Sequence, residues 1–207
     1  MPPKVKFTKD EIIGAAVGVV RKKGFTGLTA REVAGVLQTS TRPIFTYYDT
    51  MDQLKRDVFE AAKEIHKNRI KQGLKHKVPF LGVGLQYIAF AREDPELCRL
   101  LFLTKPDGAV GSAGDALEMA QELVRESLMR IYNIDGYTAD CYFRDLWLVV
   151  FSFTTLIVTG DCPYSDEEMS AILSEVSLSV CKAYKEIPGL ARGDYDKDAI
   201  FRELVKK

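Results

Sequence analysis

The sequence predicts an all-α protein in which a small N-terminal helical domain precedes a larger helical domain. Apolar side chains recur along the chain at helical spacing, and no convincing run of alternating apolar and polar residues predicts a strand. The segments 8–11 (TKDE) and 29–32 (TARE) have the capping-box pattern that starts helices. With 46% hydrophobic and 28% charged residues, the 207-residue chain has the composition of a folded globular protein.

The first two predicted helices follow these capping boxes. Thr8 is the expected N-cap of the first helix, Glu11 reaches back to it, and Gly24 ends the helix. Thr29 is the expected N-cap of a second, shorter helix. The apolar residues expected to form the core of this unit are Ile12, Ile13, Ala16, Val19 and Val20 in the first helix and Val33, Ala34, Val36 and Leu37 in the second.

A short third helix is expected after a tight turn at residues 38–39 (Gln-Thr). Ser40 can cap it, and Pro43 then falls at the third helical position. Proline is tolerated there because the amides of the first turn have no partner within the helix. Thr50 can cap a fourth helix that runs through apolar residues towards Gly73.

Proline and glycine residues divide the rest of the chain into further helices. Pro79 restarts the chain, the pair 94–95 (Asp-Pro) places proline at the start of a helix, and the pair 188–189 (Pro-Gly) interrupts the chain near its end. A glycine-rich loop is expected over 107–114. The predicted helices cover 80–93, 95–104, 115–132, 138–159, 166–186 and 196–206.

The second and third predicted helices, joined by a tight turn, have the arrangement of a helix-turn-helix. At about 100° per residue, Ile44 and Tyr48 fall on one side of the third helix and can pack on the first two helices. The arc roughly opposite presents a guanidinium, a hydroxyl, a phenol and a rigid apolar ring, which suit the bases and phosphates of a major groove. The residues of this arc are Arg42, Pro43, Thr46 and Tyr47.

The distribution of charge also favours a polyanionic partner at the N-terminal end. Residues 1–70 carry 13 Lys or Arg against 8 Asp or Glu. The rest of the chain has the opposite imbalance, with an equal excess of Asp and Glu over Lys and Arg. No acidic residue lies between Val33 and Tyr48, where a carboxylate would repel phosphates. Chance asymmetry is the alternative explanation of the overall charge distribution.

Other functional classes find little support in the sequence. The four cysteines are widely spaced and contain no C-x-x-C pair, which is typical of reduced thiols in a cytosolic protein. With only His66 and His76 as imidazoles, neither a metal site nor a catalytic centre is expected, and no cofactor is predicted. The N-terminus has no apolar signal segment, and the apolar run 146–158 is too short to span a membrane.

The segment from about Thr8 to Val58 resembles the DNA-binding domain of TetR-family transcriptional regulators. The matching string is IIGAAVGVVRKKGFTGLTAREVAGVLQTSTRPIFTYYDTMDQL. The resemblance implies that the second helix begins at the DNA backbone and groove edge, and that the third makes base and phosphate contacts. The residues that it assigns to DNA binding are Thr29, Arg31, Ser40, Thr41, Arg42, Pro43, Thr46 and Tyr47.

The sequence departs from the family pattern at three positions. Gln38 occupies a turn position where the family usually has Gly, and a non-Gly residue at positive φ would cost about 1 kcal/mol unless the turn differs. Phe45 replaces the usual Tyr and Met51 replaces the usual Lys, so a hydroxyl and a positive charge for phosphate binding are lost. Both losses predict weaker non-specific DNA affinity without loss of the fold.

The run 146–158 is apolar nearly all round a helix and must therefore be buried on two sides. The domain's own core can cover one side, and a second copy of the chain most simply covers the other. The resemblance implies the same arrangement, with a homodimer interface formed by the helices near 138–159 and 166–186. A two-fold dimer would place its recognition helices about one turn of DNA apart.

Aromatic residues of the larger domain are candidates for the wall of a cavity that binds a small hydrophobic effector. Ordinary core packing is the alternative use of the same rings. Arg144 and Asp145 are costly to bury unpaired, so they are expected either in the dimer interface or at the polar end of the cavity. The candidate wall residues are Tyr87, Phe90, Phe102, Tyr142, Phe143, Trp147 and Phe151.

We therefore expect a helix-turn-helix DNA-binding domain over 1–52 and an effector-binding and dimerisation domain over 53–207. The expected function is that of a cytoplasmic homodimeric transcriptional regulator, most simply a repressor, and not of an enzyme. Effector binding would favour a state whose recognition helices no longer match successive major grooves of a palindromic operator. The alternatives are a dimeric all-α scaffold that does not bind DNA and a small-molecule-binding protein.

Overall fold

The computed structural model describes residues 7–104 and 111–205. These residues form ten α-helices and two short 3₁₀ helices, and they contain no strand. The predicted all-α fold is confirmed.

Short connections join the helices along the chain. The N-terminal unit contains α1 (Lys9–Lys23), η1 (Phe25–Gly27), α2 (Ala30–Val36) and α3 (Ile44–Tyr47), and α4 (Met51–Gly73) leads out of it. The larger domain adds α5 (Pro79–Glu93), α6 (Pro95–Phe102), α7 (Ala113–Tyr132), α8 (Gly136–Thr159), α9 (Asp166–Glu186), η2 (Leu190–Arg192) and α10 (Lys197–Val205). These bounds agree with the predicted helices to within a few residues, except at α3. The first half of the predicted loop over 107–114 lies outside the described residues, and its last two residues form the start of α7.

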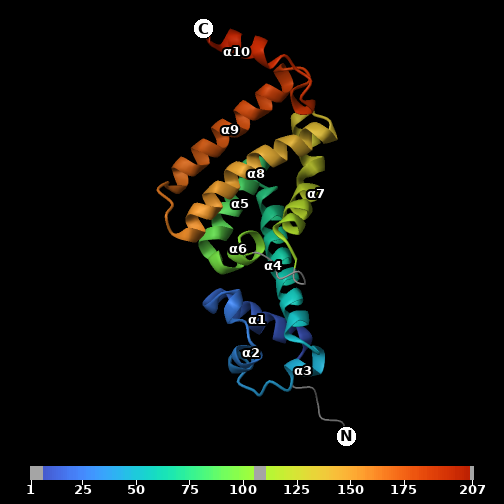
Figure 1. The fold of residues 1–207 in the computed structure, drawn as a ribbon, viewed down its shortest axis with the longest axis vertical. Helices are drawn as coiled ribbons and strands as arrows, with labels where there is room; N and C mark the ends of the chain where they lie inside the picture. The colour runs from blue at the N-terminus through green and yellow to red at the C-terminus, as the bar shows by residue number, and fades with distance from the viewer. Residues whose placement is uncertain (1–6, 105–110, 206–207) are drawn as a thin grey trace.

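Figure 1 shows an elongated molecule with the α1–α3 unit at one end and α10 at the other. Between them, α4 runs out of the small unit into the larger bundle, where it packs against α5. In the small unit the same helix packs against α1. The predicted boundary at 52/53 falls in the first turn of α4, so both predicted domains share one unbroken helix.

Side-chain caps start α1 and α2. The Thr8 hydroxyl accepts a hydrogen bond from the Glu11 N–H, and the Glu11 carboxylate accepts one from the Thr8 N–H, so the first capping box is present. The Thr29 hydroxyl accepts a hydrogen bond from the Glu32 N–H. The second predicted box is nevertheless incomplete, because the Glu32 carboxylate binds Nζ of Lys23 at 2.5 Å instead.

The third helix is shorter than predicted, and Ser40 does not cap it. Pro43 is the N-cap residue of α3, and no side chain caps this helix. Proline disfavours the helical conformation of the residue before it, which agrees with a regular helix that begins only after Pro43. Residues 41–43 form a turn, in which the Thr41 carbonyl accepts hydrogen bonds from the Ile44 N–H at 3.1 Å and the Phe45 N–H at 3.4 Å.

One continuous apolar core extends from the α1–α3 unit into the larger domain, whereas α10 has no buried residue. In α2, Val33 and Ala34 are buried, whereas the predicted core residue Val36 is 51% exposed. The reason is helical geometry. At about 100° per residue, Val33, Ala34 and Leu37 lie on one side of the helix. Val36 points away from that side.

The central helix of the larger domain is α8, which packs against α5, α6, α7 and α9. By length and composition alone this 24-residue helix could cross a membrane, although the apolar run considered from the sequence is shorter. A buried core helix passes the same test, so this is weak evidence for a membrane span. The buried residues of α8 are Ala139, Cys141, Tyr142, Phe143, Leu146, Val150, Phe153, Thr154 and Val158.

Candidate nucleic-acid interface and apolar cavity

The turn between α2 and α3 holds Gln38 in the left-handed region, at a φ of 51°. Here the Thr39 N–H donates to the Ala34 carbonyl at 3.0 Å, and the Gln38 N–H donates to the Gly35 carbonyl at 3.2 Å. A glycine would adopt this φ without strain, whereas glutamine costs about 1 kcal/mol. The turn therefore keeps its left-handed geometry despite the unfavourable residue.

The residues predicted to bind DNA lie at accessible positions on and around α2 and α3. Ile44 and Tyr48 are buried, as predicted for the inner side of the third helix. Phe45 lies between Ile44 and Tyr48 in the sequence but is 48% exposed, so it is a further candidate for contact with DNA. Of the eight predicted residues, Thr41 and Pro43 are half-buried, and the exposed ones are Thr29, Arg31, Ser40, Arg42, Thr46 and Tyr47.

Two tyrosines tie the end of α3 to its neighbours. The Tyr48 hydroxyl donates to Oδ2 of Asp57 on α4 at 2.9 Å, and Nζ of Lys9 on α1 binds the same oxygen at 2.7 Å. Burial, followed by the nearby Asp57 carboxylate, raises the pKa of Tyr48. The Tyr47 hydroxyl donates to the backbone carbonyl of Phe7 at 3.1 Å. These contacts fix α3 against α1 and α4 before any ligand binds.

Asp94, immediately before α6, joins the small unit to the larger domain. Arg21 of α1 donates to both of its carboxylate oxygens, at 2.6 and 3.1 Å. Arg69 of α4 lies 3.5 Å from the same carboxylate and 2.8 Å from that of Glu93. The two-pronged contact between Arg21 and the buried Asp94 fixes the relative orientation of α1 and α6.

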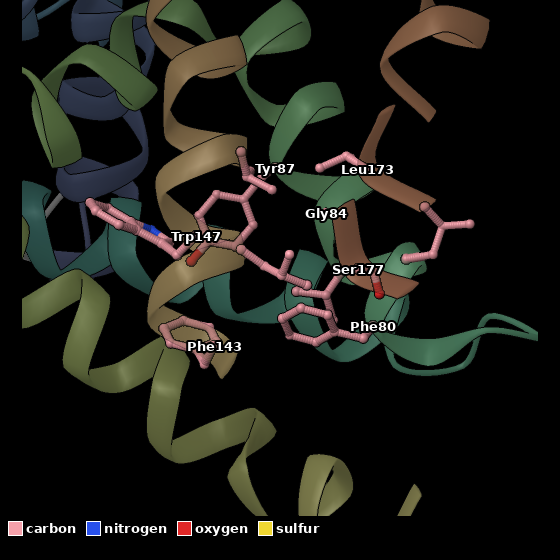
Figure 2. Close-up of a pocket in the computed structure, with 11 residues that line it drawn as sticks. Phe80, Gly84, Tyr87, Phe143, Trp147, Leu173 and Ser177 are labelled. Carbon is pink, nitrogen blue, oxygen red and sulfur yellow. The ribbon is translucent and has the colours of Figure 1, made fainter. Parts of the chain in front are cut away.

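A cavity lies between α5, α8 and α9, with room for about one water molecule at a volume of about 20 Å³. Three predicted wall residues line it: Tyr87, Phe143 and Trp147. Figure 2 shows these rings together with Phe80, Leu173 and Ser177, which the sequence analysis did not single out. The remaining wall residues are Leu81, Val83, Gly84, Leu146 and Val150.

The other four predicted aromatic residues do not line this cavity. Tyr142 packs on Phe80, and its hydroxyl forms a hydrogen bond with the Ser177 hydroxyl at 2.6 Å, in which either group can be the donor. Phe151 stacks on Trp147, with 4.9 Å between ring centroids. Two more rings, those of Phe90 and Phe102, pack around His66.

His66 on α4 is the feature of this domain that sequence reasoning missed. Its side chain is fully buried, and neither ring nitrogen has a hydrogen-bond partner. Burial, with a smaller contribution from Arg69, lowers the pKa of His66 to about 3, so the ring is neutral. Its nearest ring is that of Tyr87, edge-on at 4.3 Å between centroids. The Tyr87 hydroxyl is also buried; it lies close to the Trp147 indole, but the two are outside hydrogen-bond geometry.

Arg144 and Asp145 form an ion pair with each other at 2.7 Å, and neither lines the cavity. Asp145 also accepts a hydrogen bond from the Tyr184 hydroxyl of α9 at 2.5 Å. The pair therefore contributes to the contact between α8 and α9. On the outer surfaces of the same two helices, Leu148 is 53% exposed and Leu178 is 70% exposed.

The described residues offer little for metal or thiol chemistry. No three of their His, Cys, Asp or Glu side chains lie close enough together to hold a metal ion. The cysteines are free, and burial raises the pKa of the Cys98 thiol to about 12, which keeps it protonated.

Comparison with known proteins identifies similar folds at low sequence identity. No protein-family model and no curated protein matches the chain. The fatty acid degradation regulator FadR from Bacillus halodurans matches with a TM-score of 0.59 and 16% identity, covering 84% of this chain and 98% of that one. The TetR-family member SCO1917 from Streptomyces coelicolor A3 matches with a TM-score of 0.59 and 21% identity, covering 81% and 96%. A TetR variant from Acinetobacter baumannii AYE in complex with minocycline matches with a TM-score of 0.56 and 16% identity, covering 87% and 98%.

Proposed function

We propose that this chain, which has a TetR-like fold, is a DNA-binding transcriptional regulator. The observation that carries the proposal is the outer face of the helix-turn-helix, where Arg42, Thr46 and Tyr47 are exposed while Ile44 and Tyr48 are buried. The Arg42 guanidinium just before α3, and the hydroxyl of Thr46 and the phenol of Tyr47 on it, match the acceptors that DNA presents at its base edges and phosphates. The basic N-terminal third of the chain adds sequence-independent attraction.

Within this proposal the predicted contact residues have different roles. Arg42 reads a guanine through O6 and N7, and Pro43 contacts a thymine methyl group. Thr29 and Arg31, at the start of α2, contact the phosphate backbone. Thr41, Thr46 and Tyr47 bind phosphates or base edges, and the hydrogen bond from Tyr47 to Phe7 is then exchanged or shared.

The regulator acts as a homodimer through α8 and α9. The exposed Leu148 and Leu178 support this, because large apolar side chains on two neighbouring helices are expensive to leave in water. A two-fold dimer presents two copies of α3, and a palindromic operator matches that symmetry. In this setting the chain works in the cytoplasm.

An effector binds between α5, α8 and α9, and its binding causes the protein to release the operator. The regulator is therefore a repressor. The apolar wall around Trp147 supports a small hydrophobic effector, and a protein of similar fold has been solved in complex with minocycline. The cavity must widen to admit such a molecule, since its present volume is about 20 Å³. The widened state is the one that binds DNA poorly.

A dimeric scaffold that does not bind DNA is the main rival, and a small-molecule-binding protein is the second. Neither rival explains why acidic residues are absent from Ala34 to Tyr48 while Arg42 is exposed there. An enzyme is disfavoured because, within the described part of the chain, His66 is buried without a hydrogen-bond partner and His76 bonds to the backbone of Val78, so neither imidazole is paired with a nucleophile or an acid.

The decisive experiment measures DNA binding. An operator is first selected from a random duplex library with the wild-type protein, and gel-shift titrations then compare variants at matched salt. Arg42→Ala should weaken binding to the selected operator about 10- to 100-fold, corresponding to about 1–3 kcal/mol. Arg31→Ala should weaken binding to operator and random duplex alike. Lys75→Ala, at an exposed position beyond α4, is the matched control. Wild-type affinity in both arginine variants would reject the assignment of α3.

The dimer is tested by sedimentation at micromolar concentration. The wild-type protein should sediment at about twice the chain mass of 23.2 kDa. Leu178→Glu should produce monomers, because an unpaired charge in an apolar interface costs several kcal/mol, about 3 or more. Met129→Glu, on the outer surface of α7, is the control and should remain dimeric. A wild-type monomer would exclude the two-half-site arrangement.

A further inference from the structure

The larger domain buries polar groups that have no hydrogen-bond partner. Both ring nitrogens of His66 are in this state, and the Tyr87 hydroxyl has only the Trp147 indole nearby, outside hydrogen-bond geometry. The His66 and Tyr87 rings are in contact at 4.3 Å between centroids. A buried polar group without a partner destabilises the fold, so it requires an explanation when it occurs in a native protein. Here two such side chains meet, one from α4 and one from α5.

Tyr87 connects this polar pair to the cavity. Its ring is part of the cavity wall, and Figure 2 shows its hydroxyl next to Trp147, which also lines the cavity. The other wall residues come from α5, α8 and α9, whereas His66 contacts Tyr87 from α4. A rotation of the Tyr87 ring out of the cavity wall would open the cavity towards His66, which lies directly behind that ring.

The surroundings of the pair determine which polar group could bind there. None of the cavity-lining residues is charged. His66 is neutral and therefore offers one donor and one acceptor, while a tyrosine hydroxyl offers both. The nearest cation is Arg69, which already binds Glu93 and Asp94. A charged ligand group would lose its hydration without gaining a counter-ion.

We propose that Tyr87 and His66 form the polar end of the effector site, and that the effector is an apolar molecule with one uncharged hydrogen-bonding group, an alcohol or a ketone. The apolar body lies against Val83, Leu146 and Leu173, and the polar group binds the Tyr87 hydroxyl first and His66 second. This inference rests on the proposed effector cavity and adds the chemical class of the ligand.

The test uses the full-length protein and five probes with the same chain length and different head groups: octane, 1-octanol, 2-octanone, octanoate and octylamine. Binding is followed near neutral pH by the fluorescence of Trp147, the one tryptophan of the chain, and by the melting temperature. The alcohol and the ketone should bind about tenfold more tightly than octane and than either charged probe. Octanoate or octylamine binding as tightly as 1-octanol would overturn the proposal, and so would binding of no probe.

Variants then locate the polar group of the ligand. Tyr87→Phe removes the hydroxyl but keeps the ring, and it should reduce 1-octanol affinity about fivefold while leaving octane affinity unchanged. His66→Leu should reduce 1-octanol affinity in the same selective way. Tyr132→Phe, a hydroxyl removed outside the cavity wall, should behave as wild type. Unchanged 1-octanol affinity in Tyr87→Phe would overturn the site. The gel-shift titration without probe tests DNA binding separately, so failure of the regulator assignment is distinguishable from failure of the site.

Discussion

The two ends of the molecule treat their buried polar groups in opposite ways. Around α3, the Tyr48 hydroxyl is paired with Asp57, which is itself paired with Lys9. In the larger domain, the His66 ring and the Tyr87 hydroxyl are also buried, but neither has a partner within hydrogen-bond geometry. The first arrangement gives a surface whose shape is set in advance. The second gives an interior whose hydrogen bonding is incomplete, and in our proposal a bound effector supplies the missing partner.

The largest expected effect of this difference is on acid stability. The pKa of His66 is about 3 in the folded protein and about 6.5 in the unfolded chain, so between these values the unfolded chain binds one more proton. Acidification from about pH 6.5 therefore favours unfolding, by about 1.4 kcal/mol per pH unit and about 3 kcal/mol by pH 4. Denaturant titrations at a series of pH values measure this slope.

Two histidine variants isolate the source of that slope. His66→Leu removes the buried titrating group and should flatten the pH dependence by about 1.4 kcal/mol per unit between these pKa values. His76→Leu changes the exposed histidine and should leave the slope as in wild type. Equal slopes in all three proteins would mean that His66 is solvated or partnered in solution.

The next effect concerns the paired tyrosine. Tyr48→Phe removes the hydroxyl that donates to Asp57 and should lower the free energy of unfolding by about 1 kcal/mol. Because Tyr48 anchors the end of α3, operator affinity should fall as well. Thermal denaturation measures the change in stability, and gel-shift titration measures the change in operator affinity. A variant as stable as wild type would show that the contact with Asp57 contributes nothing.

The smallest effect has the opposite sign. Tyr87→Phe deletes a buried hydroxyl without a partner and should leave the unliganded protein as stable as wild type or more stable by up to about 1 kcal/mol. The same thermal denaturation, carried out beside Tyr48→Phe, compares one chemical change in two environments. A loss of stability similar to that of Tyr48→Phe would remove the contrast between the two regions.

Local patterns were sufficient to predict most of the fold. Caps such as Thr8 and Thr50, and the helical spacing of apolar residues, depend only on neighbouring sequence, so the helices were placed to within a few residues. The third helix was predicted to start too early because two local rules conflict there. Ser40 favours a helix start, while Pro43 disfavours a helical residue at position 42, and the second rule prevails.

The candidate cavity was less predictable because periodicity indicates which face of a helix is buried but not what lies opposite. Phe143 and Trp147 line the cavity, whereas Phe90, equally apolar, packs against His66. For the same reason His66 could be considered only as a metal ligand. Its significance is the absence of a hydrogen-bond partner, which only the tertiary structure reveals.

The unbroken path of α4 has a mechanical consequence. His66 and Met51 lie on this one helix, separated by roughly 22 Å at 1.5 Å per residue. A stiff rod of that length works as a lever: a tilt of about 5° at the His66 end displaces the Met51 end by about 2 Å. In the proposed homodimer both ends would move, so the separation of the two α3 helices would change by up to about 4 Å against a DNA repeat of about 34 Å. A rearrangement the size of one side chain would thereby be magnified into a mismatch with the two half-sites of the proposed operator.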